Sequence, residues 1–109
     1  MGDLGIHVWT GQSGKKYRYT VYMFGTAFGP GPANYIFVRE SRPGHYLPLY
    51  FGQTADLSEP FDDAIAAECL RQNRVTHIHV RHSDAREELR RAERSDLISA
   101  QNPPCNSMR

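Results

Sequence analysis

The sequence predicts an α+β fold: a small, mainly antiparallel β-sheet flanked by two or three helices, with an extra N-terminal β-hairpin. Two observations support this prediction. Strand-like alternation dominates the first half of the chain, where turn clusters divide it into pairs, and helical spacing of apolar residues appears only in the second half. The 109 residues are the size of one ordinary domain, with the hairpin extension at 1–32 and a core at 33–107.

The N-terminal hairpin is predicted from two strand-like segments around a polar turn. Residues 6–10, IHVWT, alternate apolar and polar side chains, and residues 17–24, YRYTVYMF, are aromatic and β-branched with the same period. The cluster GQSGKK between them is typical of a turn. The Gly- and Pro-rich stretch GTAFGPGPA at 25–33 then predicts a loop.

A second hairpin follows from NYIFVRE at 34–40 and LPLYF at 47–51, joined by the turn sequence SRPGHY. Pro48 has no N–H to donate, so we expect it at a sheet edge or a bulge. Gly52 comes directly after the strand. We expect it to turn the chain with a positive φ.

The first helix is predicted over residues 60–72, PFDDAIAAECLRQ. Phe61, Ile65 and Cys69 recur every four residues and would share one buried face. Pro60 suits the first helical position, where its missing N–H has no partner to lose.

A fifth strand at 76–80, THIHV, and a final helix complete the fold. Ser83 or Asp84 can cap this helix, and Pro103-Pro104 prevents its continuation beyond about residue 100. Helical spacing predicts an inward stripe of Ala85, Leu89, Ala92 and Leu97.

Composition restricts the possible partners and compartment. The formal charge is +1, so a charged partner must be recognised through a local patch. The N-terminus has no apolar run long enough for a signal peptide or membrane span, and we expect a cytoplasmic protein. Cys69 and Cys105 lie far apart without metal-ligand spacing. We predict that they are reduced, with a disulfide as the alternative.

Three segments in this order resemble the GIY-YIG nuclease superfamily over about residues 33–107. Tyr50-Phe51-Gly52 stands where that family has YIG, GQTADL resembles its continuation, and DLISAQNPPCN resembles its closing helix and turn. The resemblance implies hydrolysis of DNA phosphodiester bonds with one Mg²⁺ or Mn²⁺. In that family a Glu holds the metal, tyrosines flank the nucleophile, an Arg binds the phosphate and a terminal Asn shapes the site.

The resemblance implies catalytic roles for Tyr35, Tyr50, Glu93 and Asn106, with Glu93 as the metal ligand. Phe37 is the alternative to Tyr35, but it lacks a hydroxyl, and Ala33 or Asn34 replaces the motif's first glycine. The family's Glu precedes its Asn by twelve residues. That count from Asn106 reaches Arg94, one residue beyond Glu93. We also expect Asn106 to form side-chain-to-backbone bonds.

The family's phosphate-binding Arg has no counterpart, because Pro60 stands at its position, eight residues past Gly52. A proline offers the phosphate no donor, so we expect catalysis to be impaired or lost. Whether the chain is an enzyme stays open at this point. The alternative function is a non-catalytic module on the same fold that binds nucleic acid or protein.

Other basic residues could contact nucleic acid. Arg86, Arg90 and Arg94 repeat every four residues along the last helix, with Arg91 beside them. Arg39 or Arg42 could replace the missing Arg. The alternative for the stripe is a solvated face paired with neighbouring acidic residues. His77 and His79 share one strand face, which we expect to be exposed; a metal site or a proton shuttle are the alternatives.

Overall fold

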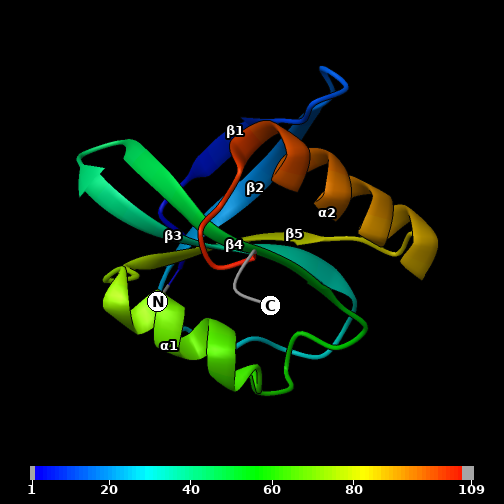
Figure 1. Cartoon of the computed structure of the whole chain (residues 1–109). Coiled ribbons are helices and arrows are strands. Elements are labelled where there is room, and N and C mark those ends of the chain that lie inside the picture. Colours follow the sequence, from blue (N-terminus) through cyan, green and yellow to red (C-terminus); the bar gives the residue numbers. More distant parts are fainter. Residues whose placement is uncertain (1, 107–109) are drawn as a thin grey trace.

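The computed structural model describes residues 2–106, which form a curled five-stranded antiparallel sheet with one helix on each face (Figure 1). The elements in chain order are β1 (Ile6–Thr10), β2 (Lys16–Met23), β3 (Ala33–Arg42), β4 (His45–Thr54), α1 (Ala64–Gln72), β5 (His77–His82) and α2 (Glu87–Gln101). The α+β prediction and both hairpins are confirmed. No helix among these residues is long and apolar enough to cross a membrane.

The sheet order is β1-β2-β5-β3-β4, so β5 joins the two hairpins. The N-terminal hairpin therefore extends the sheet, because β2 pairs with β5 on the side opposite to β3. β4 is an edge strand, and its pairing with β3 shifts register between Phe37 and Val38, opposite Pro48. The expectation of an edge or bulge at Pro48 is confirmed.

Alternation along the strands builds a separate core on each face of the sheet. On the α1 face, buried strand residues pack against helix residues; the cluster contains Ala33, Phe37, Leu49, Tyr50, Ile78 and Val80 with Ala66, Cys69 and Leu70. On the α2 face the cluster contains Trp9, Tyr19, Ile36, Val38, Phe51 and Leu97. Neighbouring residues such as Tyr50 and Phe51 thus belong to opposite faces.

α1 begins later than predicted. Asp63 is its N-cap and accepts a hydrogen bond from the Ala66 N–H at 3.0 Å, so Pro60 lies before the helix. The later start rotates the buried face onto Ala66, Cys69 and Leu70, while Ile65 is 53% exposed. The predicted start at 60 and the predicted Phe61–Ile65–Cys69 face are wrong, because the aspartate cap fixes the first turn.

α2 also presents an unexpected face to the sheet. Its N-cap is Arg86 rather than Ser83 or Asp84, and its buried residues are Arg90, Glu93 and Leu97. Of the predicted inward stripe, Leu97 is buried, whereas Leu89 and Ala92 are exposed. The stripe is wrong because the polar residues of α2 find buried hydrogen-bond partners on the sheet.

Gly52 lies inside β4 and has no positive φ, so the prediction of a turn glycine is wrong. It pairs with Tyr35 across the β3–β4 ladder. A Cβ at this position would overlap the Tyr35 ring. The glycine is needed because an aromatic ring lies directly over it.

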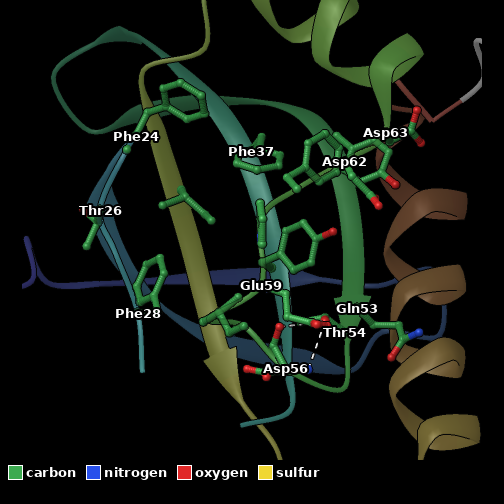
Figure 2. A pocket seen from close by; sticks show the side chains of 17 residues that line it. Phe24, Thr26, Phe28, Phe37, Gln53, Thr54, Asp56, Glu59, Asp62 and Asp63 are labelled. Atoms are coloured by element: carbon green, nitrogen blue, oxygen red, sulfur yellow. Dashed lines mark hydrogen bonds between the residues drawn. The ribbon is translucent and has the colours of Figure 1, made fainter. Parts of the chain in front are cut away.

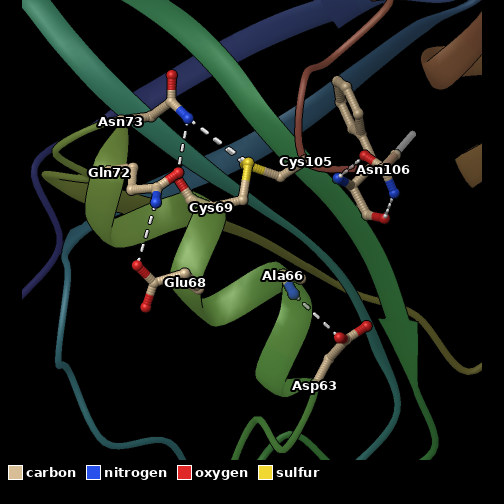
Figure 3. The surroundings of a disulfide bond; sticks show 9 residues. Asp63, Ala66, Glu68, Cys69, Gln72, Asn73, Cys105 and Asn106 are labelled. Carbon is tan, nitrogen blue, oxygen red and sulfur yellow. Dashed lines mark hydrogen bonds between the residues drawn. A yellow bond between two sulfur atoms is a disulfide. The ribbon is translucent and has the colours of Figure 1, made fainter. Parts of the chain in front are cut away.

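Cys69 of α1 and Cys105 form a disulfide, with their Cα atoms 5.6 Å apart (Figure 3). The prediction of reduced cysteines is therefore wrong, because the fold brings together two residues that are 36 apart in sequence.

The segment after α2 covers the edge of β4. The Cys105 N–H donates to the Leu49 carbonyl at 2.9 Å. The Phe51 N–H donates to Asn106 Oδ1 at 2.8 Å, and Asn106 Nδ2 donates to the Phe51 carbonyl at 3.0 Å. The predicted side-chain-to-backbone bonds of Asn106 are confirmed, and they protect the edge strand from other partners.

Candidate functional site

Two predicted site residues, Tyr35 and Tyr50, lie together on the α1 face. Their rings are stacked with centroids 6.4 Å apart, and the Phe61 ring packs against both at 6.3 and 5.4 Å. The two tyrosines come from adjacent strands of one hairpin, so the period of two aligns them.

Glu93 lies on the α2 face, away from the tyrosine pair. Its Oε2 accepts a hydrogen bond from the Tyr19 hydroxyl at 2.5 Å, and its Oε1 accepts one from Arg81 Nε at 3.1 Å. Burial and the Glu93 carboxylate together raise the pKa of Tyr19 well above its usual value. Both carboxylate oxygens thus have protein partners, and the sheet separates Glu93 from Tyr35 and Tyr50.

Arg94, the next residue, reaches the edge of β4 instead. Its Nε donates to the Phe51 carbonyl at 2.9 Å. With Arg91 it lines a small polar pocket of about 180 Å³, here called the edge pocket, whose residues are Tyr50, Gly52, Gln53, Arg91 and Arg94. The residue twelve positions before Asn106 therefore lies beside the tyrosine pair, and it carries a guanidinium rather than a carboxylate.

The environment of Tyr35 keeps its hydroxyl protonated. Burial raises the pKa of Tyr35 above its usual value of 10, the neighbouring Tyr50 raises it further, and the charge of Arg94 opposes both effects only in part. A neutral phenol can donate a hydrogen bond to an anion. It is a poor general base near neutral pH.

Arg90 is buried, and it orients the side chain of Gln53, which lines the edge pocket. It is 6% exposed; its Nε donates to Gln53 Oε1 at 3.2 Å and its Nη1 to the Ala85 carbonyl at 2.5 Å. Because Arg90 occupies the Gln53 oxygen, the Gln53 amide nitrogen remains available as a donor. The Arg90 carbonyl in turn accepts a bond from Asn34 Nδ2 at 2.9 Å.

The remaining predicted arginines do not join the edge pocket. Arg86 is exposed at the start of α2, eight residues before Arg94, or about 12 Å along the helix. Arg39 pairs with Leu47 on the far part of β3, beyond Tyr35 and Phe37. The structure thus brings Arg94 to the tyrosine pair, bonds the buried Arg90 to Gln53 and leaves Arg39 and Arg86 away from the edge pocket.

One residue of the edge pocket, Gln53, was not predicted from the sequence, and Arg91 was predicted only as a neighbour of the basic stripe. Arg91 precedes Arg94 by three residues, a spacing that puts both on one side of a helix, and Gln53 directly follows Gly52. Both signals were present in the sequence, but their use required knowing that α2 crosses the edge of β4.

His77 and His79 are 7% and 0% exposed, so the expectation of an exposed face is wrong. The Trp9 indole N–H donates to His79 Nδ1 at 2.9 Å. Burial, reinforced by His7 and His77, lowers the pKa of His79 to about 3. Within residues 2–106 no three His, Cys, Asp or Glu side chains are grouped so that they could hold a metal ion.

Comparison with known proteins finds no match to the chain among protein families, curated proteins or solved structures. The geometry of the edge pocket and of the tyrosine pair is therefore the basis on which a function can be inferred.

Proposed function

We propose that this chain is a nuclease-like domain that binds the phosphate backbone of nucleic acid, DNA in the first place, at the edge pocket without cleaving it. The observation that carries the proposal is the position of Arg94 beside Tyr35 and Tyr50. In the superfamily that the sequence resembles, this count from the closing asparagine belongs to the metal-binding Glu.

A guanidinium at this point favours an anion and disfavours a metal ion. It carries only N–H donors and a permanent positive charge, so it binds phosphate oxygens and cannot ligate Mg²⁺ or Mn²⁺. The bond from Arg94 Nε to the Phe51 carbonyl fixes the plane of the group. The Arg91 guanidinium, whose Nε donates to Glu87 Oε2 at 2.7 Å, and the Gln53 amide nitrogen add further donors to the same pocket.

Other features support binding over cleavage. Pro60 supplies no donor where the resemblance places the phosphate-binding Arg, and loss of such a group typically costs about 10²–10³ in rate. The raised pKa of Tyr35 leaves its hydroxyl protonated near neutral pH. Glu93 already has Tyr19 and Arg81 as partners.

Fluorescence anisotropy with a labelled single-stranded DNA of mixed sequence tests the proposal across a salt series. We expect affinity to fall with salt, and Arg94→Gln to weaken binding and reduce the slope of log K against log[salt] by about 0.7. Arg18→Gln is the matched control, because Arg18 is an exposed residue of β2 outside the edge pocket and the charge change is the same.

Two results would overturn the proposal. Equal affinity and equal salt slope for the parent chain and Arg94→Gln would exclude the edge pocket as the phosphate site. Cleavage of the same DNA with Mg²⁺ or Mn²⁺, abolished by Tyr50→Phe, would show that the chain is an active nuclease.

A further inference from the structure

A larger cavity of about 640 Å³ opens on the α1 face beside the edge pocket (Figure 2). We call it the aromatic pocket, because six aromatic side chains line it: Phe24, Phe28, Tyr35, Phe37, Tyr50 and Phe61. Figure 2 shows Phe24, Thr26 and Phe28 on one side and Gln53, Asp62 and Asp63 on the other. A flat apolar group could enter between these walls.

The aromatic rings support one another around this space. Phe61 contacts Phe37 with centroids 5.1 Å apart, and Phe24 contacts Phe37 at 5.7 Å. Phe37 is 5% exposed and forms the floor, whereas Phe24 is 50% exposed at the rim. A ring-shaped ligand would therefore meet ring faces and edges on several sides.

The charged residues that line the aromatic pocket, among those the structure describes, are all acidic. Asp56 bonds Ser58 through the Ser58 N–H and hydroxyl, and Asp63 caps α1. Glu59 and Asp62 form no ion pair with any residue from 2 to 106. Two carboxylates thus remain available to accept hydrogen bonds from a ligand.

The aromatic pocket and the edge pocket share Tyr50 and Gln53. One molecule could therefore place a flat ring in the first and an anionic group in the second. A nucleotide has these two parts, joined through a sugar. Its base would lie among the aromatic side chains, and its phosphate would lie against Arg91 and Arg94.

We propose that the aromatic pocket holds one unpaired nucleobase, with a preference for guanine, while the adjoining phosphate lies in the edge pocket. This inference rests on the proposed function and specifies its ligand. Stacking on aromatic side chains accepts any base. Glu59 and Asp62 accept hydrogen bonds and donate none when ionised, which favours guanine, because its N1–H and N2–H donors are adjacent.

The test uses labelled oligonucleotides whose flanking positions are all abasic, so that no neighbouring base can enter the aromatic pocket, and whose central position is guanine, adenine, thymine or a further abasic site. Anisotropy should give the central-guanine strand the tightest binding, about tenfold tighter than the abasic strand. Asp62→Asn should reduce the preference for guanine over adenine. Asp84→Asn, an exposed position outside the pocket with the same charge change, should leave the preference intact.

Phe61→Leu should bring the guanine strand towards abasic affinity while leaving Arg94-dependent binding in place. Phe24→Leu provides a second variant that keeps the test valid if Phe61→Leu does not fold, because Phe24 is half exposed at the rim. In NMR spectra of the parent chain, adding the central-guanine strand should shift the ring signals of Phe61 and Tyr50.

The outcomes separate this inference from the proposed function. If the abasic and guanine strands bind equally and both depend on Arg94, the base pocket is excluded and phosphate binding stands. If no strand binds, both proposals fail. If tetramethylammonium shifts the Phe61 and Tyr50 ring signals and guanine does not, the pocket is a site for organic cations, and the base assignment is overturned.

Discussion

The two faces of the sheet are closed in different ways. α2, with 15 residues, covers its face through buried polar contacts, among them Glu93 with Tyr19 and Asn34 with the Arg90 carbonyl. α1, with nine residues, covers its face through apolar packing and one disulfide. The α1 face also carries the aromatic pocket.

This difference separates polar residues that stabilise the fold from residues that remain available to a ligand. On the α2 face, the buried Glu93 carboxylate accepts hydrogen bonds from Arg81 of β5 and from Tyr19 of β2. On the α1 face, Glu59 and Asp62 have no ion-pair partner among the described residues. A charged residue near the tyrosines is therefore a better candidate for binding a ligand than a buried charged residue on α2.

The largest expected effect comes from removing the disulfide that closes the α1 face. Reduction of Cys69–Cys105, or the double variant Cys69→Ala/Cys105→Ala, should lower the free energy of unfolding by about 3–4 kcal/mol. The bridge spans 36 residues and holds α1 against the segment that bonds β4. Urea unfolding with and without dithiothreitol measures the loss.

The double variant is its own control, because dithiothreitol should leave its unfolding midpoint unchanged. A parent chain with equal stability in both conditions would show that the packing of α1, and not the bridge, holds this face.

A second prediction disrupts the α2 face. Glu93→Ala leaves the buried Tyr19 hydroxyl and the Arg81 guanidinium without their acceptor, and we expect a loss of about 2–4 kcal/mol. Glu88→Ala on the same helix should change stability by less than about 0.5 kcal/mol, because Glu88 is exposed. Thermal melts of the three proteins compare the two positions.

Isothermal titration on the same variants tests whether Glu93 also takes part in binding nucleic acid or a metal ion. We expect nucleic-acid affinity to be unchanged in Glu93→Ala once folding is verified. Mg²⁺ or Mn²⁺ binding that the parent shows and Glu93→Ala lacks would instead make Glu93 a metal ligand as well as a structural residue.

The strands were predictable because each carries its own signal. The alternation in residues 6–10 and 17–24 survives in β1 and β2, and the second hairpin follows from its turn and its β-branched residues. Helix boundaries were harder, because Asp63 and Pro60 are both valid start signals and only packing decides between them. No local sequence pattern predicts that β2 pairs with β5.

The site was predictable only where neighbours along a hairpin determine it. Tyr35 and Tyr50 meet because β3 and β4 pair locally. Glu93 and Arg94 differ by one position, which turns a helical side chain by about 100° and so sends one towards Tyr19 and the other to the edge of β4. Tyr19 lies 74 residues from Glu93 and Cys105 lies 36 residues from Cys69, and no spacing rule reaches these partners.

The smallest expected effect is the pH dependence of stability that the buried His79 causes, and it measures how well the α2 face excludes water. The pKa of His79 is lowered to about 3 in the folded chain, against 6.5 for the exposed side chain. Below pH 6.5 the unfolded chain therefore binds a proton that the folded chain does not, so stability is full above pH 6.5 and falls as the pH decreases towards 3. The slope is about 1.4 kcal/mol per pH unit, or about 2 kcal/mol at pH 5.

Urea unfolding between pH 5 and 7 checks this slope above the range in which carboxylates titrate. His7, whose pKa burial also lowers, adds to the slope with the same sign. His79→Gln keeps an acceptor for the Trp9 indole and should flatten the profile, whereas His45→Gln, at an exposed position, should not. If His79→Gln keeps the parent slope, water reaches this imidazole, and the α2 face is as open as the face that carries the aromatic pocket.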